Sequence, residues 1–308
     1  MIKKYLSAIL LGLAFLLISF SLIFDVSIKP SPLIPYVTAL IKGQPVSPNQ
    51  DLANLSYQSL SQIVTPISGK TVLVEWGDVG QKLVSTGAIN LTKFESRYGG
   101  LTPEQVQVLT GNDLHQITFT KDNIQFWTNV LWALGLTQNS KVLDEGPMTA
   151  RSDQVPVENY ASTAGWTLGS KDAMELYSSQ QLIALTQEQQ ELVYKIGENI
   201  FRPCCGNHTS YPDCNHGMAV LGLIELMVSQ EVSEEEIYEA ALAFNSYAFE
   251  NTYITTAAYL AKQGIGWEEV SAYELLGPQY SSGQGAANIS QLVGEVPGAP
   301  KAGGSCGA

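Results

Sequence analysis

The sequence predicts a mainly α-helical protein whose folded domain lies outside the cytoplasm and is anchored by one N-terminal transmembrane helix. Three observations lead to this prediction. A long uncharged segment follows the N-terminal lysines, apolar residues recur at helical spacing through most of the chain, and only one segment has a clear strand pattern. The chain has 308 residues, of which 45% are hydrophobic, so it can bury a large core.

The first element is the apolar segment at 5–24. A run of about 20 apolar residues matches the hydrocarbon thickness of a bilayer. Lys3 and Lys4 precede it, which favours an N-terminus in the cytoplasm. A cleaved signal peptide would have a shorter apolar region and a small-residue cleavage site, and no clean site of that kind follows here. We therefore expect an uncleaved anchor at 1–24, a location in the cell membrane, and an extracytoplasmic position for the rest of the chain.

Composition divides the remainder into three parts. Residues 25–50 contain five prolines and are typical of an extended tether. Residues 51–280 are expected to form the α-helical domain, with a candidate boundary near 150–160, where the helical pattern is interrupted. Residues 281–308 are rich in Gly and Ala, which predicts a flexible tail.

The helices of the domain are predicted from their first residues and from their spacing. Capping boxes, in which a Ser or Thr stands three residues before a Gln or Glu, mark three helix starts. They are Thr102 with Gln105, Thr186 with Gln189, and Ser233 with Glu236. Apolar spacing predicts helices over 102–111, 122–136, 186–201, 215–230, 233–249, 252–263 and 267–275. The best strand signal is the segment KTVLVEW at 70–76.

Charge and motifs exclude several classes of function. The formal net charge is -13, and no basic stripe exists to neutralise phosphates, so we expect no nucleic-acid partner. The sequence contains no dinucleotide-binding glycine motif, P-loop, nucleophile elbow or c-type haem attachment motif.

The side chains that could bind a metal or act as nucleophiles are concentrated in one stretch, RPCCGNHTSYPDCNHG, at 202–217. It contains three of the four cysteines and two of the three histidines, namely Cys204, Cys205, His208, Cys214 and His216. Pro203 is expected to end one helix and Asp213 to cap the next. Cys214 would then lie in the first helical turn, where the helix dipole stabilises a thiolate.

The leading hypothesis is a metal site. Cys204, Cys205 and Cys214 with His208 or His216 would form a Cys₃His set, which is common for zinc, and Cu(I) also prefers thiolate and imidazole. Because Cys204 and Cys205 are adjacent, we expect only one of them to ligate. Because residues two apart on a helix diverge, Cys214 and His216 would converge only in an irregular first turn.

Two other hypotheses remain open. In the first, Cys204, Cys205 and Cys214 are catalytic in thiol–disulfide exchange, with Cys214 as the attacking thiolate. In the second, Cys214 forms a structural disulfide with Cys204 or Cys205, as extracytoplasmic thiols commonly do. Cys306, in the C-terminal segment, would serve as a shuttle thiol or a fourth metal ligand. Exported thiol proteins or metal proteins would be the partners.

Three short motifs, FRPCCGN, PDCNHGMA and VSEEEI, occur within 186–253. In this stretch the chain resembles the membrane-anchored thiol oxidoreductases of cytochrome c maturation. Those proteins have a helix ending in Arg-Cys-Pro-x-Cys-x-Asn, an Asp-Ser-Asn start of a second helix, and a third helix that begins with Ser and acidic residues. The resemblance implies three packed helices, an extracytoplasmic thiol site and cytochrome-type substrates.

The resemblance also assigns positions. It places Cys204 and Cys205 near the redox cysteines of the family, and its polar positions correspond to Asn207, Asp213 and Asn215. The chain departs from the family pattern in having adjacent cysteines, which form an unstrained disulfide with difficulty. It also has Cys214 and His216, which the family pattern lacks.

Overall fold

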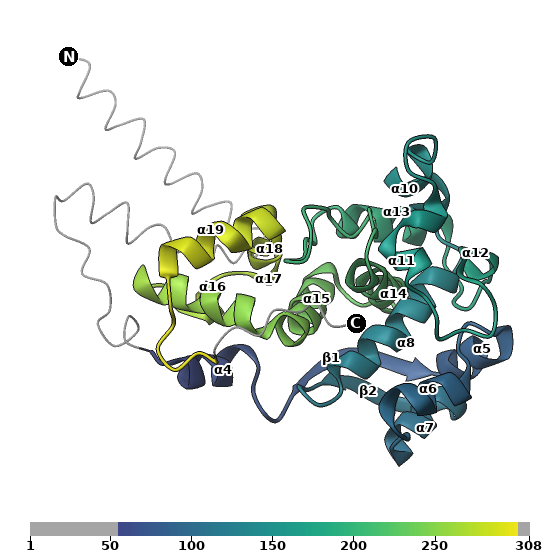
Figure 1. Ribbon diagram of the computed structural model, residues 1–308, viewed down its shortest axis with the longest axis horizontal. Coiled ribbons are helices and arrows are strands. Elements are labelled where there is room, and N and C mark those ends of the chain that lie inside the picture. Colours follow the sequence, from purple (N-terminus) through teal and green to yellow (C-terminus); the bar gives the residue numbers. More distant parts are fainter. Residues whose placement is uncertain (1–54, 301–308) are drawn as a thin grey trace, which may run out of the picture. The chain divides into compact units, whose positions relative to one another are not determined.

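Helices dominate the structure, a computed structural model that describes residues 55–300 (Figure 1). All of these residues belong to one compact unit, Pro48–Ala308. The predicted anchor, the tether and Cys306 lie outside the described residues. Within 55–300, no helix has both the length and the apolar character needed to cross a membrane.

The longer elements follow one another with short connections. The helices of eight or more residues are α4 (Tyr57–Val64), α5 (Val79–Thr86), α6 (Leu91–Tyr98), α7 (Pro103–Thr110), α8 (Ile124–Thr137), α13 (Gln187–Gly197), α14 (Asn215–Ser229), α15 (Glu234–Ala248), α16 (Glu250–Lys262) and α19 (Gly283–Val293). The short helices are α9 (Lys141–Glu145), α10 (Pro147–Ala150), η1 (Val157–Asn159), α11 (Ala161–Ala164), α12 (Ala173–Leu176), η2 (Trp267–Glu269), α17 (Ala272–Leu275) and α18 (Pro278–Ser281). The strands are β1 (Lys70–Gly77) and β2 (Asp113–Phe119).

Helices α8 and α14 form the centre of the core. Nearly every residue of both is buried, whereas the sequence predicted one apolar stripe on each. Their backbones meet at two glycines. A Cβ on Gly135 would lie 2.1 Å from the Met218 carbonyl oxygen, and one on Gly222 would lie 2.5 Å from that of Leu131. The close crossing therefore requires glycine at both positions.

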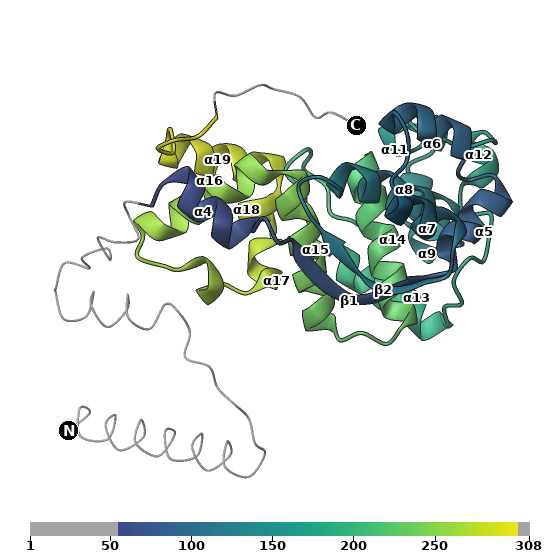
Figure 2. The ribbon, with the colours of Figure 1, turned by 90° about the horizontal axis from the view of Figure 1, so that it is seen from below.

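The two strands pair antiparallel, with Lys70 opposite Phe119 and Gly77 opposite Asp113 (Figure 2). In β1 the side chains alternate, so that Val72, Val74 and Trp76 are buried and the residues between them are exposed. This alternation confirms the strand predicted at 70–76. Strand β2 was not predicted, because the sequence DLHQITF buries only its last apolar residues.

All three predicted capping boxes are present, at the starts of α7, α13 and α15. The predicted end of α13 is wrong, because the helix ends at Gly197 and not at Pro203. The returning loop causes this early end. The Ser210 hydroxyl donates to the Tyr194 carbonyl oxygen at 2.6 Å, and the Ser210 amide donates to the Gly197 carbonyl oxygen at 3.3 Å.

The C-terminal part also differs from the sequence prediction. Residues 267–275 form η2 and α17 where one helix was expected. The tail predicted from residue 281 is not a tail over 283–293, which form α19. Ser282 caps this helix, and Ile289 and Val293 are buried in the core. The segment was predicted to be flexible because Gly and Ala dominate its composition and only a few apolar residues mark its buried face.

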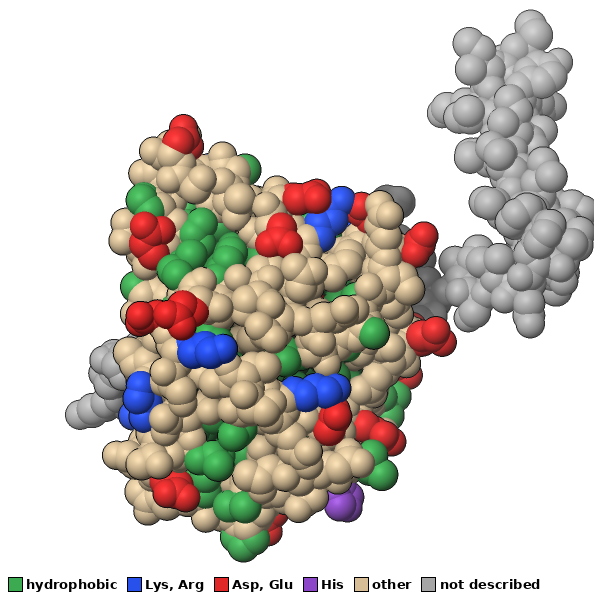
Figure 3. Space-filling model, turned by 90° about the vertical axis from the view of Figure 1, so that its right-hand side faces the viewer, with side chains coloured by type: hydrophobic (Ala, Val, Ile, Leu, Met, Phe, Trp, Pro, Cys, Tyr) green, Lys and Arg blue, Asp and Glu red, His purple; other side chains and the backbone are tan. Residues whose placement is uncertain are grey.

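The candidate boundary near 150–160 does not divide the described residues. The indole of Trp132 in α8 donates to the Ser162 carbonyl oxygen at 2.8 Å, and the Ser162 amide donates to that of Asp213 at 3.2 Å. On the face drawn in Figure 3, acidic and basic side chains are interspersed without a continuous basic stripe.

Candidate metal centre

The cysteine-rich stretch forms the loop between α13 and α14. The loop folds back on itself where Phe201 bridges to His208 and the Thr209 amide donates to the Ile200 carbonyl oxygen at 2.8 Å. From α19, the Gly283 amide donates to the Cys205 carbonyl oxygen at 2.7 Å. These contacts fix the two adjacent cysteines opposite the start of α14.

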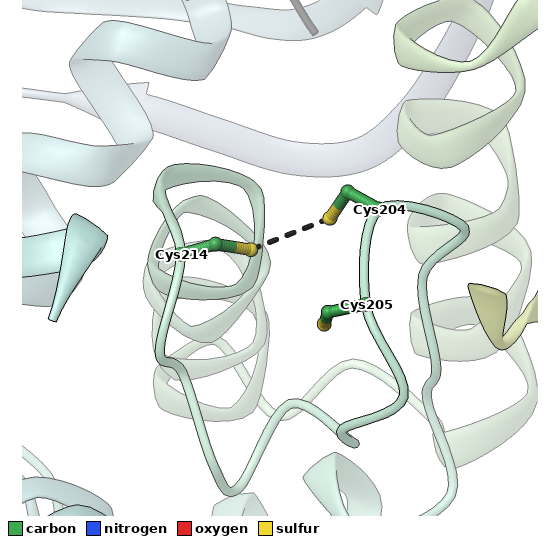
Figure 4. Close-up of side chains that lie close together, drawn as sticks. All are labelled: Cys204, Cys205 and Cys214. Carbon is green, nitrogen blue, oxygen red and sulfur yellow. Dashed lines mark hydrogen bonds between the residues drawn. The ribbon is translucent and has the colours of Figure 1, made fainter.

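Three sulfur atoms meet at this place (Figure 4). The Sγ atoms of Cys204 and Cys214 are 3.4 Å apart, and all three Sγ atoms, including that of Cys205, lie within 4.8 Å of one another. The three cysteines are free and half-buried. Both adjacent sulfurs belong to the group, so both are within reach of one site, while the expectation that only one of them ligates stays a prediction.

The N-cap of α14 lies one residue later than predicted. Its N-cap is Cys214, whose sulfur accepts a hydrogen bond from the Gly217 amide at 3.4 Å. Asp213, the predicted cap, instead accepts from the Asn207 side-chain amide at 2.8 Å and pairs with Arg202. Asn215, which the resemblance placed at a polar position, is the first residue of the helix.

Arg202 is the residue that the sequence analysis missed. Its side chain is fully buried. Its Nε donates to the Cys214 sulfur at 3.0 Å, and its two terminal nitrogens donate to the carbonyl oxygens of Asn207 and Tyr211 at 3.2 and 3.0 Å. The guanidinium lies against Gly217, where a Cβ would be only 2.4 Å from Cζ. A basic residue beside the cysteines, in a chain with only 16 Lys and Arg, was the available signal.

These contacts give the three thiols different pKa values. Hydrogen bonds from Cys204 and Cys205, together with the charge and hydrogen bond of Arg202, outweigh burial and hold the pKa of Cys214 well below its usual value. The pKa of Cys204 is raised, because it donates to the other two thiols and is buried. Cys205 has a pKa of about 11, since its hydrogen bond with Cys204 lowers the value less than Cys214 and burial raise it. Cys214 is therefore the thiolate and Cys204 donates to it at 3.4 Å, whereas the Cys205 thiol also donates to Asp213 Oδ1 at 3.7 Å.

The two histidines do not join the sulfurs. The His216 ring packs on Phe249 with 4.5 Å between centroids, and burial lowers its pKa. The His208 ring contacts Phe201 at 5.9 Å, and its buried Nδ1 has no hydrogen-bond partner among the described residues. Within 55–300, the group of metal-binding side chains formed here contains only the cysteines. The predicted Cys₃His set is therefore not assembled in this arrangement.

No protein-family model, curated protein or solved structure matches the chain. Three sulfur donors at mutual distances below 4.8 Å, one of them a stabilised thiolate, form a cluster that could hold a metal ion.

Proposed function

We propose that this protein is a membrane-anchored, extracytoplasmic protein that binds a soft transition-metal ion, zinc or copper, through Cys204, Cys205 and Cys214. The observation that carries the proposal is the convergence of three sulfurs around one point. Thiolates prefer Cu(I) and Zn(II) to hard cations such as Mg²⁺ or Ca²⁺. A fourth position on zinc would be filled by water or by Cys306.

Arg202 supports this function through Cys214. A metal ligand must be a thiolate, and the buried guanidinium stabilises that form before any ion arrives. Asp213 and Asn207 hold the guanidinium in place, and Gly217 leaves room for it. Hydrogen bonds of this kind to a ligand sulfur orient it and tune the bound metal.

The test is metal analysis of the full-length protein, purified in detergent without oxygen. We expect about one zinc or copper ion per chain and the release of three reactive thiols when a chelator removes it. Cys214→Ser should abolish stoichiometric binding, whereas Ala substitution of His208 or His216 should leave it unchanged. A metal-free protein in which all three thiols react freely, even after reconstitution with either ion, would contradict the proposal.

A second candidate function is thiol–disulfide exchange with exported or cytochrome-type proteins. It is favoured by the 3.4 Å between the sulfurs of Cys204 and Cys214 and by the stabilised thiolate of Cys214. It also agrees with the resemblance to the cytochrome c maturation oxidoreductases. Equilibration in glutathione buffers, followed by peptide mapping, tests it. Reversible formation of a Cys204–Cys214 disulfide supports the function, and thiols that stay reduced across the whole range of potentials reject it.

A further inference from the structure

The thiol cluster has a coordination geometry that differs from an ordinary zinc site. It offers three sulfurs, and in the part of the chain that the structure describes no fourth His, Cys, Asp or Glu ligand atom lies within 4.8 Å of all three. The Asp213 Oδ1 atom is 3.7 Å from the Cys205 sulfur, but it is paired with the Arg202 guanidinium. Structural zinc sites are almost always four-coordinate and are closed by four protein ligands. The described residues therefore do not close a four-coordinate structural zinc site, but they supply every ligand for an ion that forms three bonds.

We propose that the cluster preferentially binds a trivalent metalloid, As(III) or Sb(III), through all three cysteines. The inference goes beyond the proposed function: it concerns the same three thiols and names a different class of ion that they prefer. Trivalent arsenic and antimony are soft, form three bonds to sulfur, and carry a lone pair on the fourth side. The lone pair occupies the position for which the described residues supply no donor.

The sulfur spacing agrees with this geometry. With metal–sulfur bonds of about 2.3 Å, a tetrahedral ion separates its sulfurs by about 3.8 Å and a planar three-coordinate ion by about 4.0 Å. A lone pair compresses the bond angles toward a right angle, which reduces the separation to roughly 3.4 Å for bonds of the same length. The sulfurs of Cys204 and Cys214 are 3.4 Å apart. This one pair, joined here by a hydrogen bond, is at the spacing of a pyramidal site, and the other two sulfur–sulfur distances are each within 4.8 Å.

Charge balance favours the same ion. The buried Arg202 is paired with Asp213, so these two residues contribute no net charge beside the sulfurs. Three thiolates neutralise a trivalent ion, whereas zinc would leave one excess negative charge and Cu(I) would leave two. An uncompensated charge in a largely buried site is costly. The neutral complex of As(III) or Sb(III) with three thiolates is therefore the one that avoids a buried net charge.

Binding requires no electron transfer. Arsenite is neutral As(OH)₃ in water, and each of its As–O bonds is replaced by an As–S bond. Three thiols and one As(OH)₃ give one As(SR)₃ and three waters, and a proton from solvent substitutes for the one that the Cys214 thiolate has already lost.

The experiment uses the reduced full-length protein in detergent with sodium arsenite, zinc chloride and Cu(I) as separate probes. Arsenite binding is measured by equilibrium dialysis, the protected thiols by reaction with a chromogenic disulfide, and the coordination number by X-ray absorption at the arsenic edge. We expect one arsenite per chain, three sulfurs on arsenic, and three thiols protected. Cys204→Ser, Cys205→Ser and Cys214→Ser should each weaken arsenite binding by at least about tenfold.

Cys306→Ser tests whether the fourth cysteine takes part in arsenite binding, since a site of three sulfurs does not need it. It should leave arsenite binding unchanged, and thermal melting verifies that each variant is folded. Two protected thiols in place of three, dependence on Cys306, or displacement of arsenite by equimolar zinc would overturn the inference. Zinc or copper binding without arsenite binding refutes the inference alone. Arsenite binding without either transition metal refutes the proposed transition-metal function alone.

Discussion

Glu225 provides the sharpest test of the energetics of the core. This residue lies in the middle of α14, is fully buried, and neither carboxyl oxygen has a hydrogen-bond partner among the described residues. Burial raises its pKa well above the ordinary value of 4.5, and the nearby Ser140 hydroxyl opposes this only in part. The folded protein therefore holds Glu225 as the neutral acid at pH values where the unfolded chain has released its proton.

The direction of the pH effect follows from this difference. A group whose pKa is raised in the folded state contributes its stability fully below the unfolded pKa and loses it as pH rises toward the folded value. Each pH unit in that window lowers the free energy of unfolding by about 1.4 kcal/mol per proton. Glu225→Gln keeps the shape of the side chain and remains neutral. The variant should thus gain stability relative to the wild-type protein as pH rises above the unfolded pKa, by about 1.4 kcal/mol for each pH unit between the unfolded and folded pKa values.

The measurement is urea unfolding of the full-length protein, followed by the fluorescence of its buried tryptophans at several pH values. Comparing the two proteins at each pH cancels the titration of every other group. Glu235→Gln, which changes an exposed glutamate of α15, is the control and should follow the wild-type curve. Parallel curves for Glu225→Gln and the wild-type protein from pH 5 to pH 8 would refute the reasoning.

Three further predictions concern the site and its supporting helices. Arg202→Met leaves Asp213 without its buried partner, so it should lower the free energy of unfolding by about 3–5 kcal/mol. It should also raise the pKa of Cys214, which is measured as a shift to higher pH in the alkylation rate of this thiol. Arg202→Lys should give an intermediate shift. Gly217→Ala places a methyl group 2.4 Å from the guanidinium carbon; it should cost about 1–3 kcal/mol in thermal melting and shift the alkylation profile in the same direction. Thr186→Ala removes the cap of α13 and should lower the free energy of unfolding by about 1 kcal/mol without changing the alkylation of Cys214. A shifted alkylation profile in this variant would contradict the assignment of thiol reactivity to Arg202.

The sequence predicted the helix starts best, because capping is local. Thr102, Thr186 and Ser233 each form hydrogen bonds with a residue three positions away, and all three caps are present. Strand β2 depends on pairing with β1, which lies more than 30 residues earlier, so its own seven residues carried little signal. The early end of α13 was hidden for the same reason, since Ser210 reaches it only after the loop has folded back.

At the site, too, the sequence predicted what depends on neighbouring residues but not what depends on distant ones. The concentration of cysteines was visible in the sequence, and the structure confirms that Cys204, Cys205 and Cys214 form a cluster that could hold a metal ion. Which further groups join them depends on packing. Phe249, from the start of α16, holds the ring of His216, and no spacing rule within 202–217 contains that contact.

The position of the α14 cap explains why the sequence could not predict the thiolate environment in full. Aspartate is among the best N-cap residues, and a cap contributes about 1 kcal/mol, so Asp213 was the natural choice. Breaking a buried ion pair costs about 3–5 kcal/mol. Pairing Asp213 with the fully buried Arg202 therefore outweighs using it as a cap, and Cys214 takes the cap position instead. That shift of one residue directs the Cys214 sulfur toward the Gly217 amide and the guanidinium. The ion pair thus fixes both the start of α14 and the position of its thiolate.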